Sequence, residues 1–113
     1  MVKQGDIIKT DFDPTKGHEQ AGYRPALVLS NELFTQVTNM TLVCPITQTI
    51  RNHPLHVKLS DNIDTVGFIM CEQTRAVDLR QRQFKIIGHV PKEEIERVSN
   101  LVKASIDVSD DYT

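Results

Sequence analysis

Short apolar segments separated by turn residues occupy the first ninety positions of the chain, and this pattern constrains the fold more than any other feature. Such segments lie at 7–12, 26–29, 41–47, 56–60, 67–71 and 84–90. Proline and glycine punctuate them, as at Asp13-Pro14, because proline fixes φ and supplies no backbone donor. Continuous apolar runs such as 26–29 are typical of strands covered on both faces. The pattern predicts about five to seven strands in a small β-barrel.

Two positions interrupt the strand pattern. Pro45, inside the 41–47 segment, predicts an edge or a bulge at that point, because proline cannot donate to a strand ladder. Asn31 is suited to capping a short helical turn that contains Glu32 and Phe34. We therefore expect one helical turn between the strands at 26–29 and 41–47.

The last segment changes from strand to helix period. Pro91 suits a first helical position, and Glu93 and Glu94 suit a first turn that faces the positive end of the helix dipole. Apolar residues then recur three and four positions apart, at Ile95, Val98, Leu101, Val102 and Ile106. The predicted fold is mainly β (α+β), a β-barrel with a C-terminal amphipathic helix. It forms a single domain over 1–113, with the barrel at about 3–90, the helix at about 91–107 and a frayed tail at 108–113.

Length and charge exclude several classes of protein. The 113 residues suffice for one modest core, and 13 basic against 15 acidic side chains give a net charge of −2. This balance argues against binding of duplex DNA or a membrane surface by bulk charge. Residues 91–113 hold three basic and six acidic side chains, whereas 14–60 and 72–89 each carry a local charge of +2. A short nucleic-acid strand with few phosphate contacts therefore stays compatible with the composition.

The N-terminus and the cysteines indicate a cytoplasmic protein. Residues 1–6 contain no apolar signal region, and no apolar run approaches the roughly 18 residues of a membrane span. Cys44 and Cys71 lie in apolar segments without the spacing of a metal motif. We expect two reduced core thiols, and a disulfide between them stays open.

The connection after the first strand is the richest in chemistry, with the sequence Asp13-Pro14-Thr15-Lys16-Gly17-His18-Glu19-Gln20-Ala21-Gly22-Tyr23-Arg24-Pro25. Long loops on compact domains often carry function. Arg24 is the first candidate, because it joins this loop to a buried strand and Pro25 restricts its backbone to extended conformations. Its five donors suit a phosphate or a phosphorane. A surface ion pair is the open alternative.

Two further positions are candidates for a site. Thr47 ends a buried strand, where its hydroxyl could be held rigidly and still reach a cleft. At 72–78, polar residues replace an apolar run, and Gln73 and Thr74 offer donors and acceptors for base edges. A solvated turn with an ion pair between Arg75 and Asp78, or between Arg75 and Glu72, is the alternative there.

The sequence gives little support for a metal site or for a glycine-rich loop that binds nucleotide phosphates. His53 and His56 are three residues apart, but the segment is not helical, and nearby only Asp61 and Asp64 could complete a site. The glycines form neither a phosphate-binding loop nor a dinucleotide fingerprint, and no serine nucleophile elbow is present. We expect no cofactor and no metal.

The segments 5–8, 11–30, 44–47 and 72–78 together resemble the MazF/PemK family of bacterial toxins, in order along most of the chain. The resemblance implies an SH3-like β-barrel of the CcdB/PemK toxin type with a C-terminal helix, acting as a homodimer. It implies metal-independent, sequence-specific cleavage of single-stranded RNA, chiefly mRNA. It also implies a cognate antitoxin of the MazE/PemI type, whose acidic segment would compete for the basic loops.

Residue by residue, the resemblance makes Arg24 the catalytic arginine and Thr47 the catalytic threonine. Glu19 matches a loop glutamate considered as an additional participant. His18 falls where other members often have serine, so a catalytic contribution would be particular to this chain. Because arginine is a poor base, Glu19 or His18 is the candidate acceptor of the 2′-OH proton.

RNA recognition is expected at the loops and the polar cluster. The candidate RNA-binding residues are Lys16, Gln20, Tyr23, Arg51, His53, Gln73, Thr74 and Arg75. Tyr23 is the best stacking candidate, although it could instead pack on its own barrel. Two rival functions use the same architecture, a CcdB-like toxin that binds DNA gyrase without catalysis and a peptide-binding barrel. The pairing of Arg24 with Thr47 favours the nuclease.

Overall fold

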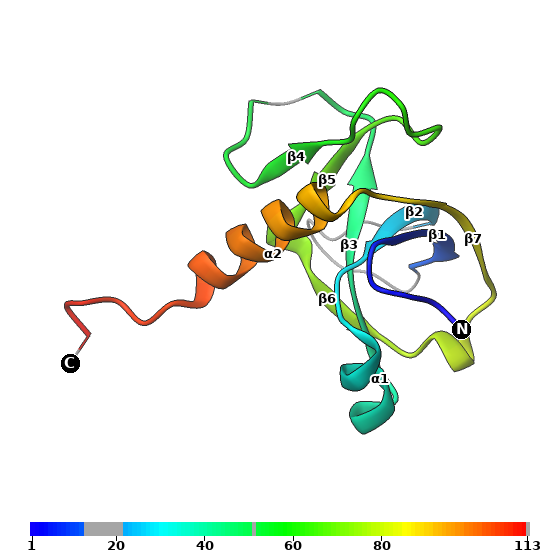
Figure 1. Cartoon of the computed structure of the whole chain (residues 1–113), viewed down its shortest axis with the longest axis horizontal. Coiled ribbons are helices and arrows are strands. Elements are labelled where there is room, and N and C mark those ends of the chain that lie inside the picture. Colours follow the sequence, from blue (N-terminus) through cyan, green and yellow to red (C-terminus); the bar gives the residue numbers. More distant parts are fainter. Residues whose placement is uncertain (13–21, 51, 113) are drawn as a thin grey trace.

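A computed structural model describes residues 1–12, 22–50 and 52–112 of the chain (Figure 1). It confirms the predicted mainly β fold with a C-terminal helix. The elements, in chain order, are β1 (Asp6–Asp11), β2 (Tyr23–Val28), α1 (Glu32–Thr38), β3 (Thr41–Thr47), β4 (His56–Lys58), β5 (Phe68–Met70), η1 (Cys71–Gln73), β6 (Arg75–Val77), η2 (Leu79–Gln81), β7 (Phe84–His89) and α2 (Lys92–Ile106), where η denotes a 3₁₀ turn.

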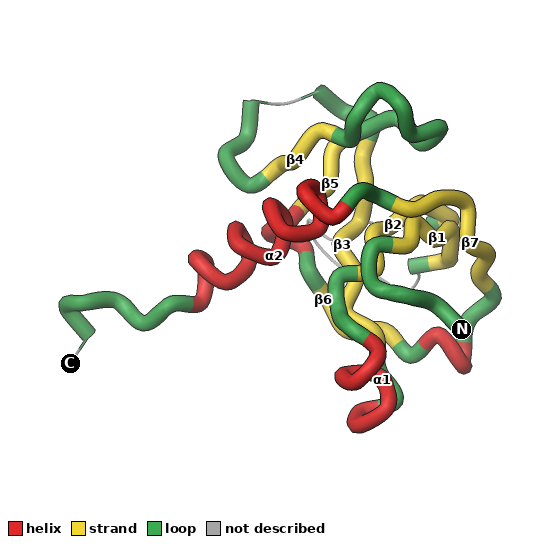
Figure 2. The backbone as a smooth tube through the Cα atoms, in the orientation of Figure 1, coloured by secondary structure: helices red, strands yellow, loops and turns green. Residues whose placement is uncertain are grey.

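The strands pair antiparallel into one strongly curved, open sheet (Figure 2). Its order is β4-β5-β3-β2-β1-β7, and β6 adds to β3 beside this path. Among the described residues β4 and β7 are the two ends of the path, so the predicted barrel takes the form of an open sheet. Strand β6 is an addition to the sequence prediction, because three residues with mixed polarity carry no clear period.

Pro45 lies in the central strand β3 and not on an edge strand, which corrects one alternative of its prediction. On one side it pairs with Ala26 of β2. On its other side β3 pairs with β6 over 41–43 and with β5 over 46–47, so Pro45 falls where the partner strand changes. The missing N–H therefore costs no ladder bond on that side, which is why proline is tolerated there.

The central strands are buried on both faces, and alternate residues of β1, β2 and β3 belong to different cores. Ile7 and Leu27 belong to the larger cluster, which α2 covers through Val98. Ile8, Ala26 and their neighbours face the smaller cluster, formed by Val2, Ile8, Phe12, Ala26, Val28, Val43, Val77 and Leu79. This two-sided burial explains the continuous apolar runs of the sequence.

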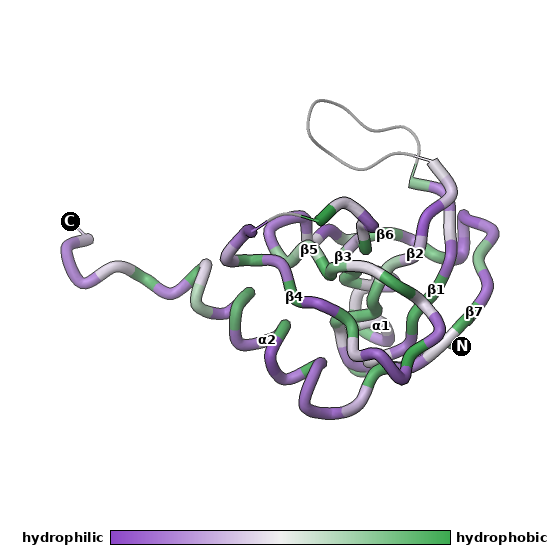
Figure 3. Tube along the Cα trace, turned by 90° about the horizontal axis from the view of Figure 1, so that it is seen from above, coloured by the Kyte–Doolittle hydropathy of each residue, from purple (hydrophilic) through white to green (hydrophobic). Residues whose placement is uncertain are grey.

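Both helices are found where the sequence predicts them. The Asn31 side chain caps α1 by accepting a hydrogen bond from the Phe34 N–H at 2.9 Å. In α2 the apolar stripe packs on the larger core through Val98, with Ile95, Leu101 and Val102 beside it. Figure 3 shows the alternation of hydrophobic and hydrophilic residues along this helix.

The prediction that Ile106 belongs to the buried stripe is wrong, because its side chain is 77% exposed. The last turns of α2 extend beyond the sheet (Figure 1), so no core surface lies under them. Residues 107–112 continue outward as an exposed segment. No helix in the described part of the chain is long and apolar enough to cross a membrane.

Candidate active site at one end of the sheet

Arg24 and Thr47 lie near the same end of the paired strands β2 and β3. Strands β2 and β3 pair antiparallel, with Ala26 opposite Pro45 and Val28 opposite Val43. Continuing this register by two residues places Arg24, near the start of β2, opposite Thr47 at the end of β3. The two residues that the sequence singles out for catalysis thus lie on neighbouring strands, although 22 positions of sequence separate them.

The same register puts a second arginine on their face of the sheet. Side chains alternate along a strand and directly opposed residues share a face, so Arg24 and Thr47 share the face of Val43. Arg75 of β6 pairs opposite Val43 and therefore joins them. Its guanidinium carbon lies 5.6 Å from the ring centroid of Phe12. Phe12 is fully buried, so it forms a rigid apolar floor under Arg75.

The Thr47 hydroxyl is held in place by its surroundings. Its side chain is almost buried, with the residue 6% exposed, and Oγ1 accepts a hydrogen bond from the Thr49 N–H at 3.2 Å. Gly67 passes close to the same backbone, and a Cβ there would lie 2.5 Å from the Thr47 carbonyl oxygen. Gly67 also has φ of +145°, so both conformation and space require glycine beside Thr47.

The loop that carries several candidate residues begins and ends at this end of the sheet. The Phe12 N–H donates to the Gly22 carbonyl at 3.0 Å, which closes the base of the connection. The candidates Lys16, His18, Glu19 and Gln20 lie outside the described residues. Arg51, on the connection after β3, also lies outside them.

Tyr23 faces away from Arg24. It pairs with Asp11 at the end of β1, and the Lys9 amino group lies 5.3 Å from the centroid of its ring. Alternation along β2 places Tyr23 on the opposite face of the sheet from Arg24. A base bound directly against Arg24 is therefore not stacked on Tyr23 unless the RNA crosses the end of the sheet.

The polar cluster after β5 divides into an inward and an outward part. Thr74 Oγ1 donates to the Cys71 carbonyl at 2.8 Å and lies 3.1 Å from Cys44 Sγ. Since the hydroxyl has one proton, the Cys44 thiol is the donor of the second bond. The Thr74 hydroxyl is thus occupied within the fold, whereas Gln73 is half-buried at the end of η1.

The histidine pair has a different third partner from those the sequence suggests. His56 Nε2 lies 2.9 Å from Glu72 Oε2, and the rings of His53 and His56 stack with centroids 4.3 Å apart. The ligand atoms of these three residues lie within 4.8 Å of one another, so they could hold one metal ion. Asp61 and Asp64 are not part of this group.

The geometry gives this cluster a clear role in joining segments. His53 Nδ1 accepts the Leu55 N–H at 3.1 Å, and the His56 side chain is only 5% exposed. The stacked rings of His53 and His56 and the contact between His56 and Glu72 together hold the connection before β4 against η1. The sequence missed Glu72 because only the β4–β5 pairing brings position 72 beside position 56.

The cysteines are both free and buried, as predicted. Burial raises the pKa of Cys44 to about 11, more than its hydrogen bond with Thr74 lowers it. Burial likewise raises the pKa of Cys71 to about 12. Both thiols therefore stay protonated at neutral pH and are poor nucleophiles.

Comparison with known sequences extends the match over nearly the whole chain. A family model described as the PemK-like, MazF-like toxin of type II toxin–antitoxin systems matches residues 3–106. The endoribonuclease toxin MazF of Escherichia coli strain K12 is 40% identical over 104 residues, which cover 92% of this chain and 89% of the relative. Endoribonuclease EndoA of Bacillus subtilis strain 168 is 30% identical, covering 97% and 98%.

Solved structures share the fold. The crystal structure of MazF from Deinococcus radiodurans superimposes with a TM-score of 0.87 at 28% identity, covering 95% of this chain and 97% of that one. A MazE–MazF crystal structure from the same organism gives 0.82 at 29% identity, with coverage of 96% and 97%.

Proposed function

The chain belongs to the PemK-like, MazF-like toxins of type II toxin–antitoxin systems and is an endoribonuclease, and on this premise we propose how it cuts RNA. The proposal is sequence-specific cleavage of single-stranded RNA, chiefly mRNA, without a metal ion. The observation that supports it is the β2–β3 register, which brings Arg24 opposite Thr47 at one end of the sheet.

RNA supplies its own nucleophile. The 2′-OH attacks the adjacent phosphorus, the bond from phosphorus to the 5′-oxygen breaks, and a 2′,3′-cyclic phosphate and a 5′-hydroxyl end result. The enzyme must accept the 2′-OH proton, stabilise the added charge on the phosphorane and protonate the leaving oxygen. Arg24 stabilises the phosphorane through its guanidinium donors, and Thr47 orients the phosphate through its hydroxyl.

The acceptor of the 2′-OH proton is proposed to come from the 13–21 connection. Glu19 or His18 supplies the base, because arginine has too high a pKa for this step. Phe12 and Gly22 bring the two ends of the connection to the end of the sheet that carries Arg24. Gln73 and Arg75, with the loop residues Lys16, Gln20 and Arg51, then contact the bases and phosphates around the cut.

The protein is proposed to act in the cytoplasm as a homodimer neutralised by an acidic antitoxin. The buried free thiols suit a reducing compartment. The end strand β7 exposes Phe84 and Ile86 on the face opposite Lys85, and these are apolar side chains of the kind that an interface covers. The MazE–MazF crystal structure is of a complex of a related toxin with its antitoxin, which supports the neutralising partner.

The test is cleavage of mixed-sequence single-stranded RNA in EDTA, with chemical mapping of the ends. We expect cuts at a defined sequence with 5′-hydroxyl ends, and loss of about 10²–10³ in kcat for Arg24→Ala and Thr47→Ala. Arg97→Ala, on the exposed face of α2, is the matched control and should cleave normally. Near-normal cutting by either site variant would overturn the assignment. Intact RNA together with gyrase inhibition would favour the CcdB-like alternative.

A further inference from the structure

A cavity of about 530 Å³ opens beside the paired ends of β1 and β2. Its lining residues are Asp11, Tyr23, Asp78, Gln81, Arg82 and Gln83. The cavity is within the usual size range of small-ligand sites. It lies between the paired ends of β1 and β2 and the segment that joins η2 to β7. None of the catalytic assignments above uses it.

The walls of the cavity are held by hydrogen bonds. Arg82 Nη1 donates to the Asp11 carbonyl, and Thr10 Oγ1 donates to the Gln83 carbonyl at 3.0 Å. These bonds tie the 82–83 segment to β1. These two hydrogen bonds therefore hold the walls of the cavity in place.

An aromatic ring lies open on this face. Tyr23 is 52% exposed, and its neighbour Lys9 has its amino group 5.3 Å from the ring centroid. A half-exposed ring beside a cation is the combination on which a nucleobase stacks while its phosphate is neutralised. The amides of Gln81 and Gln83 offer both donors and acceptors for the edge of such a base.

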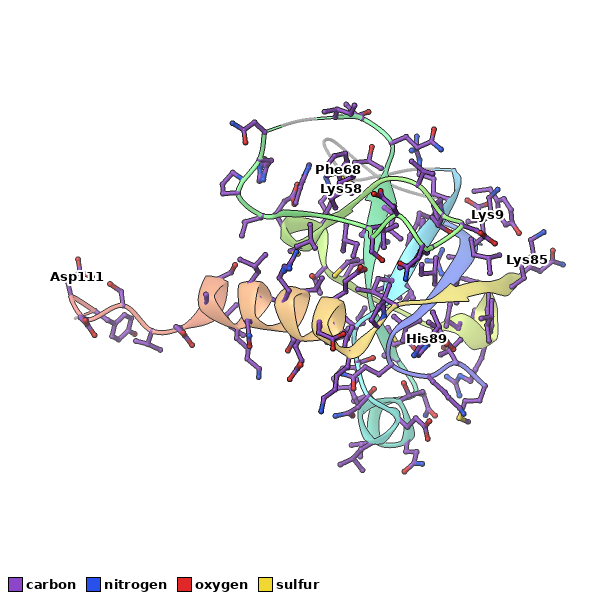
Figure 4. All side chains as sticks on the ribbon, turned by 45° about the horizontal axis from the view of Figure 1, so that its top comes forward. Lys9, Lys58, Phe68, Lys85, His89 and Asp111 are labelled. Atoms are coloured by element: carbon purple, nitrogen blue, oxygen red, sulfur yellow. The ribbon has the colours of Figure 1, made fainter. Side chains whose placement is uncertain are left out.

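Two opposed lysines, Lys9 and Lys85, add positive charge that strand pairing does not require. Lys9 of β1 lies directly opposite Lys85 of β7, and like charges at opposed positions destabilise a sheet. A lysine on the end strand β7 can protect that edge from aggregation, but Lys9 lies on an interior strand. Figure 4 labels both lysines, on the same side of the molecule. An anion between or beside them would relieve this repulsion.

Two carboxylates line the cavity, those of Asp11 and Asp78. Asp78 accepts hydrogen bonds from Arg80 Nε at 3.0 Å and from Arg80 Nη2 at 2.9 Å. The hydrogen bonds to Arg80 lower the pKa of Asp78. The cations Lys9, Arg80, Arg82 and Lys85 outnumber these two carboxylates, so the cavity and its rim carry a formal charge of +2.

We propose that this cavity is a nucleotide subsite for single-stranded RNA, in which a base stacks on Tyr23 and a phosphate is bound by Lys9 and Lys85. The proposal rests on the RNA cleavage proposed above. Tyr23 and Arg24 are consecutive residues that face opposite sides of the sheet, so RNA that crosses the end of β2 reaches both. The subsite holds a nucleotide that is not one of the two joined by the cleaved bond. It therefore lengthens the sequence that the enzyme reads.

The experiment measures binding separately from cleavage. Fluorescent RNAs that contain the cleavage sequence carry a 2′-deoxy sugar at the cut, so that they bind but lack the nucleophile. The RNAs are shortened stepwise from each end, and Kd is measured by anisotropy. Tyr23→Ala should weaken binding of the longest RNA by about fivefold to 100-fold, and Tyr23→Phe should restore it. Lys85→Ala should reduce the slope of log K against log salt by about 0.7.

Two controls decide what a loss means. Lys103→Ala, in the last turn of α2, removes an exposed lysine elsewhere and should leave both Kd and the salt slope unchanged. The Tyr23→Ala effect should vanish once the RNA is too short to reach the cavity.

Specific outcomes overturn the proposal. Unchanged binding of every RNA by Tyr23→Ala and Lys85→Ala would exclude the subsite while leaving the proposed cleavage standing. An equal loss at every RNA length would place Tyr23 at the cut itself. Loss of binding to an acidic peptide, with RNA binding intact, would assign this face to the antitoxin. Failure of the unsubstituted protein to cleave any RNA would instead overturn the proposed function.

Discussion

The two faces of the sheet near Arg24 differ in how firmly they hold their side chains. On the face proposed for catalysis, Thr47 is almost buried and Arg75 lies over the fully buried ring of Phe12. On the other face, Tyr23 is half exposed and Lys85 is exposed. The two faces are built by alternate residues of the same strands.

The difference fits the role that we propose for each face, which is catalysis for one and RNA binding for the other. Groups that stabilise a phosphorane must already be in position when charge develops, so they need a packed floor. Groups that bind a flexible strand act through stacking and counterion release, which tolerate movement. The face proposed for catalysis therefore differs from the face proposed for binding in that buried residues support its polar side chains. Four predictions test this separation, in order of expected effect.

Removal of the Phe12 ring that lies beneath Arg75 should have the largest effect. Phe12→Ala should cost about 3–5 kcal/mol of the free energy of unfolding and should also lower kcat by about tenfold or more, because Arg75 loses its support. Leu27→Ala, in the larger core on the other face, is the matched control. It should cost about 2–5 kcal/mol and leave the kcat of folded protein within about twofold.

Urea unfolding and single-turnover cleavage of the folded fraction measure the two quantities. Phe12→Leu serves if the alanine variant does not fold. Equal loss of kcat in the Phe12 and Leu27 variants would show that the catalytic face has no special dependence on its floor.

Thr74→Val should affect stability and not cleavage. The change removes the donor to the Cys71 carbonyl and the acceptor for the Cys44 thiol, which should cost about 1–3 kcal/mol of the free energy of unfolding. Thr74→Ser keeps the hydroxyl and should recover most of it. A large rise in KM for RNA with normal stability would instead restore Thr74 as an RNA contact.

Arg75→Lys should lower kcat/KM by about tenfold with little change in stability. Lysine keeps the charge but cannot place a planar guanidinium over Phe12 or bind a phosphate through two parallel donors. Arg97→Lys on α2 is the control for a general loss of arginine. If Arg75→Lys cleaves normally, charge alone suffices at this position and the packing against Phe12 has no catalytic consequence.

The buried thiols should make stability fall at high pH, the smallest of the four effects. Cys44 and Cys71 have pKa values of about 11 and about 12 in the folded protein, against 9.0 for an unburied cysteine. The folded state keeps protons that the unfolded chain loses, so this contribution is complete below about pH 9 and is lost as the pH rises through 11 and 12. The urea midpoint between about pH 7 and 11 should fall less in a Cys44→Ala, Cys71→Ala variant. Identical curves would exclude the thiols as the cause.

Much of the fold could be predicted from local patterns. The segments at 41–47 and 84–90 became β3 and β7 because apolar runs bounded by turn residues leave few alternatives. The Asn31 cap follows from backbone groups that nearby side chains can satisfy, and α2 begins directly after Pro91, which makes no side-chain capping bond. Ile106 was the failure, because periodicity shows which residues could pack but not where the opposing surface ends.

The site was only partly predictable for the same reason. Arg24 and Thr47 stand out by their positions at strand ends and by resemblance to a family. Glu72 beside His56, and Lys85 beside Lys9, come from strand pairing between distant segments. No local pattern in either segment specifies its partner.

By itself the sequence determined most of the strands, the two helices and the residue types for phosphate chemistry, because propensity, capping and periodicity act over a few neighbouring residues. Tertiary structure alone decided which of these residues share a face. The strand registers, continued to the ends of β2 and β3, put Arg24 on the same face as Thr47 and Arg75 and the adjacent Tyr23 on the opposite face. Side chains alternate along a strand, so neighbours in sequence are separated by the sheet, and residues far apart in sequence become neighbours across it.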